Sequence, residues 1–140
     1  NNRMALRSAI DVLRALKKRC EVRFVSDSQY LSAGMTEWMP SWKARGWKRK
    51  GGAIKNLDLW RELDHELGRH NLRAAWVRGH TGHPENEYAD FLATRAAREQ
   101  TESSGLVSSG FEDWLESFRE KGQYLGYMEF TSPRERYPEV

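Results

Sequence analysis

Only two segments of this 140-residue chain have a strand-like pattern, whereas several have a helical one. Residues 21–26 contain Val22, Phe24 and Val25 and are too short for a helix, which is typical of a strand, and residues 72–77 are predicted as the second strand. Helical spacing or capping signals mark residues 3–19, 28–33, 36–45, 56–67, 85–98 and 111–122. This alternation predicts the α/β fold class. Two strands do not cover that many helices, so either residues 124–131 supply further sheet or strands are missing from this chain.

The chain length fits a single domain that is followed by a serine- and glycine-rich break. Residues 101–110 contain four Ser and two Gly, which is typical of a linker. We therefore expect a domain at residues 1–100 and an extension at residues 111–140, formed by a helix and a strand. Residues 109–112 have the pattern of a capping box for the helix of that extension.

Charge is distributed unevenly along the sequence. Residues 1–50 carry 12 Lys and Arg against 4 Asp and Glu, whereas residues 101–140 carry 4 against 8. A basic half favours a polyanionic partner, although solvated helix faces would give the same composition. The mean hydropathy is −0.83 and no apolar run reaches the ~20 residues of a membrane span, so we expect no membrane partner. The single Cys20 and the lack of a leader predict a reducing, cytoplasmic environment.

Two aspartates, Asp27 and Asp90, lie at positions in the predicted elements where a carboxylate could bind a metal ion. Asp27 directly follows the first strand, and sites in α/β sheets lie beyond the carboxyl ends of strands. Asp90 shares a helix face with the small residues Ala93 and Ala97, which we expect to pack inward. A buried carboxylate needs a partner such as a divalent cation. The alternatives are a helix-capping role for Asp27 and a salt bridge or solvent for Asp90.

A glycine- and histidine-rich loop connects the second strand to the helix of Asp90. His80 lies within this loop, where a histidine can transfer protons near neutral pH. A solvated or backbone-bonded side chain is the plainer interpretation of His80. His83 lies nearer the helix start and favours a structural role.

The segment of residues 38–55 combines cations with tryptophans. It contains six Lys and Arg and no acidic residue, with Trp38, Trp42 and Trp47 among them. Aromatic rings can pack on sugars and bases while cations meet phosphates. Alternatively, Trp38 and Trp42, which share one helix face, belong to the core. The basic loop is harder to explain structurally, because no acidic residue close in sequence neutralises it.

Five blocks of the sequence, taken in order, resemble bacterial type 1 ribonuclease H. They are residues 1–4 (Asn-Asn-Arg-Met), 26–30 (Ser-Asp-Ser-Gln-Tyr), 42–47 (Trp-Lys-Ala-Arg-Gly-Trp), 55–60 (Lys-Asn-Leu-Asp-Leu-Trp) and 77–87 (Val-Arg-Gly-His-Thr-Gly-His-Pro-Glu-Asn-Glu). The resemblance extends from residue 1 to about residue 98. It does not cover the tail from residue 101.

The resemblance implies a ribonuclease H-like fold with a mixed central sheet and flanking helices, whose N-terminal strands are absent from this chain. It also implies endonucleolytic hydrolysis of the RNA strand of RNA–DNA hybrids by two Mg²⁺ ions, with Mn²⁺ as a substitute. Asp27 and Asp90 match the third and fourth of the family's four metal-binding carboxylates, and His80 matches its assisting histidine. The implied hybrid contacts are Asn1, Asn2, Gln29, Trp38, Trp42, Lys43, Arg45, Trp47, Lys48 and Asn86. Asn1, Asn2 and Gln29 would read the 2′-hydroxyl in the minor groove.

Two departures from the family pattern predict that this chain alone does not cleave hybrids. Ala5 stands where the second carboxylate belongs, and no strand with the first carboxylate precedes Asn1. We therefore expect the N-terminal strands to come from a second chain or to have been removed. The alternatives are a non-catalytic module that binds hybrids or other nucleic acid, a partner-binding role of the acidic tail, and another nuclease or transposase of similar fold.

Overall fold

The computed structural model describes residues 1–76, 83–103 and 105–127. Its contacts divide the chain into two units, Asn1–Val77 and Arg78–Pro138. Each unit is described by itself. None of the described helices has both the length and the apolar content that crossing a membrane requires.

The sheet of the first unit is a parallel pair of strands, β1 (Glu21–Ser26) and β2 (Asn71–Trp76). The register runs from Glu21 opposite Asn71 to Ser26 opposite Trp76, so both strands end at the same edge. Both predicted strands and the α/β fold class are confirmed. Within the described residues the sheet has only these two strands, and the antiparallel part of a mixed sheet stays a prediction.

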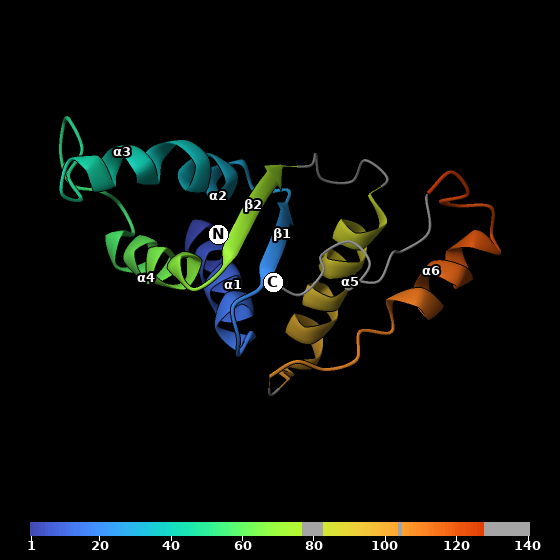
Figure 1. Ribbon diagram of the computed structural model, residues 1–140. Coiled ribbons are helices and arrows are strands. Elements are labelled where there is room, and N and C mark those ends of the chain that lie inside the picture. Colours follow the sequence, from blue (N-terminus) through green and yellow to red (C-terminus); the bar gives the residue numbers. More distant parts are fainter. Residues whose placement is uncertain (77–82, 104, 128–140) are drawn as a thin grey trace. The chain divides into compact units, whose positions relative to one another are not determined.

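Helices fill the long connection between the two strands, and one more helix precedes them (Figure 1). The helices are α1 (Asn2–Ala15), α2 (Gln29–Ala33), the π-helical turn η1 (Gly34–Trp38), α3 (Met39–Ala44) and α4 (Leu57–Gly68). Ser28 caps α2 as its sequence predicts, because its hydroxyl accepts a hydrogen bond from the Leu31 N–H at 3.1 Å. α1 ends four residues earlier than the predicted helix at residues 3–19.

The predicted break between residues 33 and 36 is wrong, because α2, η1 and α3 form one continuous helical segment. Gly34 begins the π-helical turn, and a Cβ atom there would come within 1.9 Å of the Trp60 ring. The close approach of Trp60 therefore accounts for the glycine at position 34.

The core of the first unit is formed by α1 and α4, together with the inner face of the sheet. Its fully or nearly fully buried side chains are Leu6, Ala9, Ile10, Leu13, Leu31, Met39, Ile54, Leu59, Trp60 and Leu63. Trp60 is completely buried and contacts the rings of Tyr30, Trp38 and Trp42 at centroid distances of 5.3 to 6.4 Å. The structural interpretation of Trp38 and Trp42 is therefore confirmed: both are half-buried against this core.

A buried polar cluster closes the end of the core opposite that ring cluster. The His70 ring accepts a hydrogen bond from the Cys20 N–H at 3.1 Å, and its other nitrogen lies 3.1 Å from the Leu13 carbonyl. Burial alone raises the pKa of Glu66, but hydrogen bonds from Arg69 and Arg14 outweigh that effect and hold its pKa below the usual value.

The second unit contains α5 (Pro84–Glu99) and α6 (Phe111–Arg119). His83 caps α5, since its Nδ1 accepts a hydrogen bond from the Asn86 N–H at 3.2 Å. Phe111 and Leu115 of α6 are buried with Tyr88 of α5. The apolar face of α6 thus completes a core, which weakens the partner-docking interpretation of that face.

Two predictions for the tail are wrong. The residue preceding α6 is Gly110 in a left-handed conformation without a side-chain cap, so the capping box at residues 109–112 does not form. Residues 124–127 form a turn rather than the start of a strand.

The hydroxyls of Tyr124 and Tyr127 donate to Glu87 and Glu85 of α5. Burial, followed by the bond to Glu87, raises the pKa of Tyr124 to about 12. Residues 128–131 lie outside the described residues.

We predict that Gly34→Ala lowers the free energy of unfolding by about 1–3 kcal/mol, because the new methyl group overlaps the rigid Trp60 ring. Gly34 has ordinary right-handed helical angles, so the new side chain adds no backbone strain to the steric clash. Urea unfolding followed by circular dichroism measures it.

Gly68→Ala is the matched control for this prediction. Gly68 ends α4, and a Cβ atom there meets nothing within 4 Å. We expect it to raise the free energy of unfolding by about 0.5–1 kcal/mol, from helix propensity. Equal stability of the Gly34→Ala protein and the unmodified chain would refute the packing argument.

Candidate nucleic-acid interface and carboxylate site

The carboxyl edge of the sheet carries Asp27 as the first residue after β1. Asp27 is exposed, and its carbonyl accepts a hydrogen bond of 3.0 Å from Nε1 of Trp76, the last residue of β2. Ser26 lies opposite Trp76 in the register, so this bond ties the two strand ends together. The parallel pairing therefore puts Asp27 where the sequence predicts it, at the edge that α/β proteins use for sites.

The other predicted catalytic residues lie outside the first unit. Asp90 is on α5 and is exposed, as are Ala93 and Ala97, so this face is not the one that packs within the second unit. The buried face of α5 is that of Pro84 and Tyr88 instead. The approach of Asp90 to Asp27 stays a prediction. His80 lies outside the described residues.

The residues described in the structure form no ready-made metal site. Ala5 is half-buried in the first turns of α1, and its methyl group offers no oxygen to a cation. No three His, Cys, Asp or Glu side chains gather into a cation-binding group anywhere in the described ranges. Two Mg²⁺ ions need several carboxylate oxygens. The donor set on these residues therefore does not fit a pair of ions by itself.

The three predicted minor-groove residues are all exposed at helix starts. Asn1 precedes α1, Asn2 begins it, and Gln29 begins α2. The Asn1 side chain makes no capping hydrogen bond. Gln29 also lines a hollow of about 530 Å³, together with Tyr30, Trp38 and Trp76. This hollow adjoins the sheet edge, because Trp76 is bonded to Asp27.

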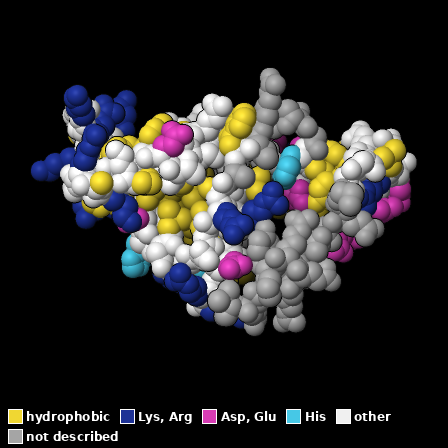
Figure 2. Space-filling view, turned by 45° about the horizontal axis from the view of Figure 1, so that its top comes forward, with side chains coloured by type: hydrophobic (Ala, Val, Ile, Leu, Met, Phe, Trp, Pro, Cys, Tyr) yellow, Lys and Arg dark blue, Asp and Glu magenta, His cyan; other side chains and the backbone are white. Residues whose placement is uncertain are grey.

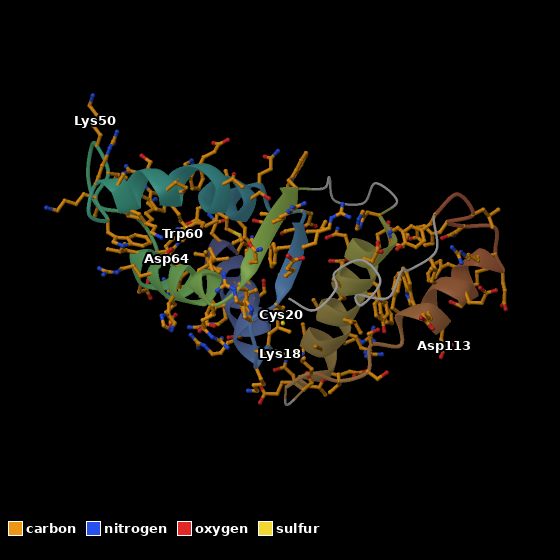
Figure 3. All side chains as sticks on the ribbon, in the orientation of Figure 1. Lys18, Cys20, Lys50, Trp60, Asp64 and Asp113 are labelled. Atoms are coloured by element: carbon orange, nitrogen blue, oxygen red, sulfur yellow. The ribbon has the colours of Figure 1, made fainter. Side chains whose placement is uncertain are left out.

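The basic segment forms a protrusion at the end of α3, seen as the group of dark blue side chains at one end of Figure 2. We call residues 45–55 the basic loop. Its tip is a tight turn closed by a bridge between Arg49 and Gly52, and Lys50 extends away from the helices there (Figure 3). Lys48, Arg49 and Lys50 are exposed, and no described acidic residue pairs with them. Arg45 is exposed as well.

The expectation that nothing neutralises this segment is wrong for Lys43. Its ammonium lies 2.9 Å from the Asp64 carboxylate, which comes from α4. Trp47 is half-buried, and the Arg61 guanidinium stands over its ring at 5.6 Å from the centroid. Lys43 and Trp47 therefore fasten the base of the protrusion to α4, whereas the tip keeps its positive charge.

A hydrogen-bond network that the sequence does not reveal joins three helices. The Arg3 guanidinium donates to both Asp58 carboxylate oxygens, at 3.2 and 3.0 Å, and to Asn56 Oδ1 at 3.1 Å. Asn56 Nδ2 and Trp60 Nε1 each donate to the Tyr30 hydroxyl at 3.0 Å. Asn56 begins α4 as predicted, but its side chain serves this network instead of capping the helix.

The comparisons with known proteins agree with the sequence motifs. A family model described as RNase H matches residues 1–98. The chain therefore belongs to the RNase H family. A ribonuclease H of Stutzerimonas stutzeri (strain A1501) is 55% identical over 96 residues, which are 68% of this chain and 64% of that protein. A ribonuclease H of Marinobacter nauticus (strain ATCC 700491 / DSM 11845 / VT8) is 54% identical over 100 residues, 71% of this chain and 68% of that protein.

A solved structure is similar in fold as well as in sequence. It is the crystal structure of LC9-RNase H1, a type 1 RNase H with the type 2 active-site motif, with a TM-score of 0.78 and 45% identity. The match covers 100% of this chain and 64% of that one. This chain thus spans about two thirds of the length of the relatives it matches.

We predict that Tyr30→Phe lowers the free energy of unfolding by about 1–3 kcal/mol. The change removes one oxygen atom, which is the acceptor of both the Asn56 and Trp60 hydrogen bonds. Trp60 is fully buried, so its N–H is left without a replacement from water. Denaturant unfolding measures the effect. Ser8→Ala removes an exposed hydroxyl from α1 and should change stability by less than about 0.5 kcal/mol.

Proposed function

We propose that this chain acts in the endonucleolytic hydrolysis of the RNA strand of RNA–DNA hybrids. The match to the RNase H family over residues 1–98 is the observation that carries this proposal. The position of Asp27 at the carboxyl edge of the parallel strands supports it, because that edge is where such a fold binds ligands.

Asp27 and Asp90 are the residues we assign to the divalent metal, Mg²⁺ or its substitute Mn²⁺, and His80 is the residue we assign to proton transfer. When bound, two such ions activate a water molecule and stabilise the leaving oxygen. Asn1, Asn2 and Gln29 would contact the minor groove, and Asn86 would also contact the hybrid. The protrusion, with Lys43, Arg45 and Lys48, would meet the phosphates.

We further propose that this chain by itself does not cleave hybrids. Ala5 supplies no carboxylate, and the described residues gather no group of three potential metal ligands. The remaining carboxylates and strands would come from residues outside this sequence. Those residues would belong either to a longer form of this chain or to a second polypeptide. No finding bears on a second chain, so its participation stays a prediction.

The first test is a cleavage assay with a labelled RNA–DNA hybrid and Mg²⁺. We expect no product above background with this chain, and none with Ala5→Glu alone. Adding the family's N-terminal strands, which carry the first carboxylate, to the Ala5→Glu protein should restore Mg²⁺-dependent cleavage. If that reconstituted protein stays inactive, the nuclease assignment fails, and cleavage by the unmodified chain would refute the proposed inactivity.

Binding without cleavage is the second candidate function, and the exposed cations of the basic loop favour it. Lys48, Arg49 and Lys50 have no described acidic neighbour, which suits contact with phosphates. Such binding would not depend on Mg²⁺, whereas it would weaken steeply as salt increases.

We predict that replacing Lys48, Arg49 and Lys50 together by Ala weakens hybrid binding. If each cation neutralises one phosphate, the slope of log affinity against log salt should become shallower by about 3. Fluorescence anisotropy in EDTA at several salt concentrations measures this slope. The control replaces the exposed Lys17, Arg19 and Arg23, which removes the same charge outside the protrusion. An equal change in slope from both triple variants would mean that the protrusion makes no special contact.

A further inference from the structure

The first turn of α1 lacks the features that usually hold a helix start in place. It has no acidic residue and no side-chain cap, although it carries the predicted hybrid contacts Asn1 and Asn2. Its charged residue is Arg3, and a cation at this end opposes the helix dipole. Helix ends without caps fray readily. The contacts that Arg3 makes with α4 therefore have to offset the missing cap and the unfavourable helix dipole.

The Arg3 guanidinium donates three hydrogen bonds to oxygen atoms at the start of α4. Two of the bonds go to the Asp58 carboxylate and one to Asn56. Paired, two-point contacts of this kind fix orientation as well as distance. The hydrogen bond with Asp58, and then its charge, raises the pKa of Arg3, and the bond from Arg3 lowers the pKa of Asp58. Both directions favour the charged pair.

The network continues from these hydrogen bonds into the rigid core. Asn56 offers its oxygen to Arg3 and its nitrogen to the Tyr30 hydroxyl, which also binds the fully buried Trp60. Each end of the network is next in sequence to a predicted minor-groove residue. Arg3 follows Asn2, and Tyr30 follows Gln29. Two segments that are far apart in sequence are thereby connected through two side-chain hydrogen bonds, Arg3 to Asn56 and Asn56 to Tyr30.

We propose that Arg3 and Asp58 are positioning residues that hold Asn1 and Asn2 in a fixed arrangement with Gln29, so that the three amides read the hybrid together. This inference rests on the proposed function, because it concerns recognition of a hybrid. Reading a 2′-hydroxyl requires donors and acceptors at set separations, which a frayed helix start would not maintain. Arg3 itself is not a hybrid contact in this proposal, since Asp58 already occupies its guanidinium.

The test compares the affinity of the full chain for an RNA–DNA hybrid and for a DNA duplex of the same sequence, in EDTA. We expect Arg3→Ala and Asp58→Asn each to reduce the preference for the hybrid by about two- to fivefold, the range for an ion pair as exposed as this one. The double replacement Arg3→Asp with Asp58→Arg should regain at least half of that preference.

Arg7→Ala is the matched control. Arg7 lies one turn further along α1 and also pairs with α4, its guanidinium being 3.5 Å from the Glu62 carboxylate. It has no place in the network, so the preference for the hybrid should not change. Thermal unfolding of each variant shows whether it remains folded at the assay temperature.

Three results would overturn the proposal. Tighter binding by Asp58→Asn would mean that a released Arg3 contacts phosphate directly. Equal losses for hybrid and DNA duplex would mean a general effect on binding. An unchanged preference in Arg3→Ala would mean that the network does not position the amides.

A second measurement keeps this inference separate from the proposed function. The Ala5 N–H donates the first hydrogen bond of α1, to the Asn1 carbonyl at 3.0 Å. By NMR, Arg3→Ala should speed hydrogen exchange at Ala5 and shift the Gln29 side-chain amide signals, whereas Arg7→Ala should do neither. If the unmodified chain shows no preference for hybrids, the proposed function fails, and the NMR result still decides whether Arg3 positions these residues. Unchanged exchange and signals in Arg3→Ala would refute the positioning role.

Discussion

The burial of Trp60 is the constraint on which most of the first unit depends. Its ring contacts Tyr30, Trp38 and Trp42, and it leaves no room for a Cβ atom at Gly34. A large indole inside a core also needs a partner for its N–H. The Tyr30 hydroxyl meets that need and, through Asn56, extends the influence of the ring to the surface. The packing of the Trp60 ring and the hydrogen bond of its N–H thus determine how α2, α3 and α4 pack together.

The same side chains connect stability with the proposed recognition of a hybrid. Gln29 begins α2 one residue before Tyr30, and Asn2 begins α1 one residue before Arg3. The polar residues for contact are exposed, while Tyr30 is bonded to the buried Trp60 and Arg3 is bonded to Asn56 and Asp58 at the start of α4. The protrusion follows a similar plan, because Lys43 at its base is paired with Asp64 of α4 and the exposed cations lie in the basic loop. Rigid support beneath an exposed contact is what a binding surface requires.

Local signals in the sequence predicted most of the elements and the position of Asp27. Ser28 followed by an apolar residue three positions later was enough for the cap of α2, and both strands were short apolar runs between polar residues. Features that depend on distant residues were missed. Trp60 packs against Gly34 inside the helical segment that continues through residues 34–38, and the partner of Lys43 is 21 positions away. Within the second unit Tyr88 rather than Ala93 packs against α6, a pairing that the sequence pattern did not predict.

By itself the sequence determined the family, the ends of the strands and the identity of the candidate catalytic residues, since these are carried by contiguous motifs and short-range periodicity. Only the tertiary structure decided that Arg3 meets Asp58, that Asn56 turns to Tyr30, and that two of the tryptophans belong to the core. The two hydrogen-bonded pairs lie 55 and 26 positions apart. They form only after the helices have packed, because no local preference brings their side chains together.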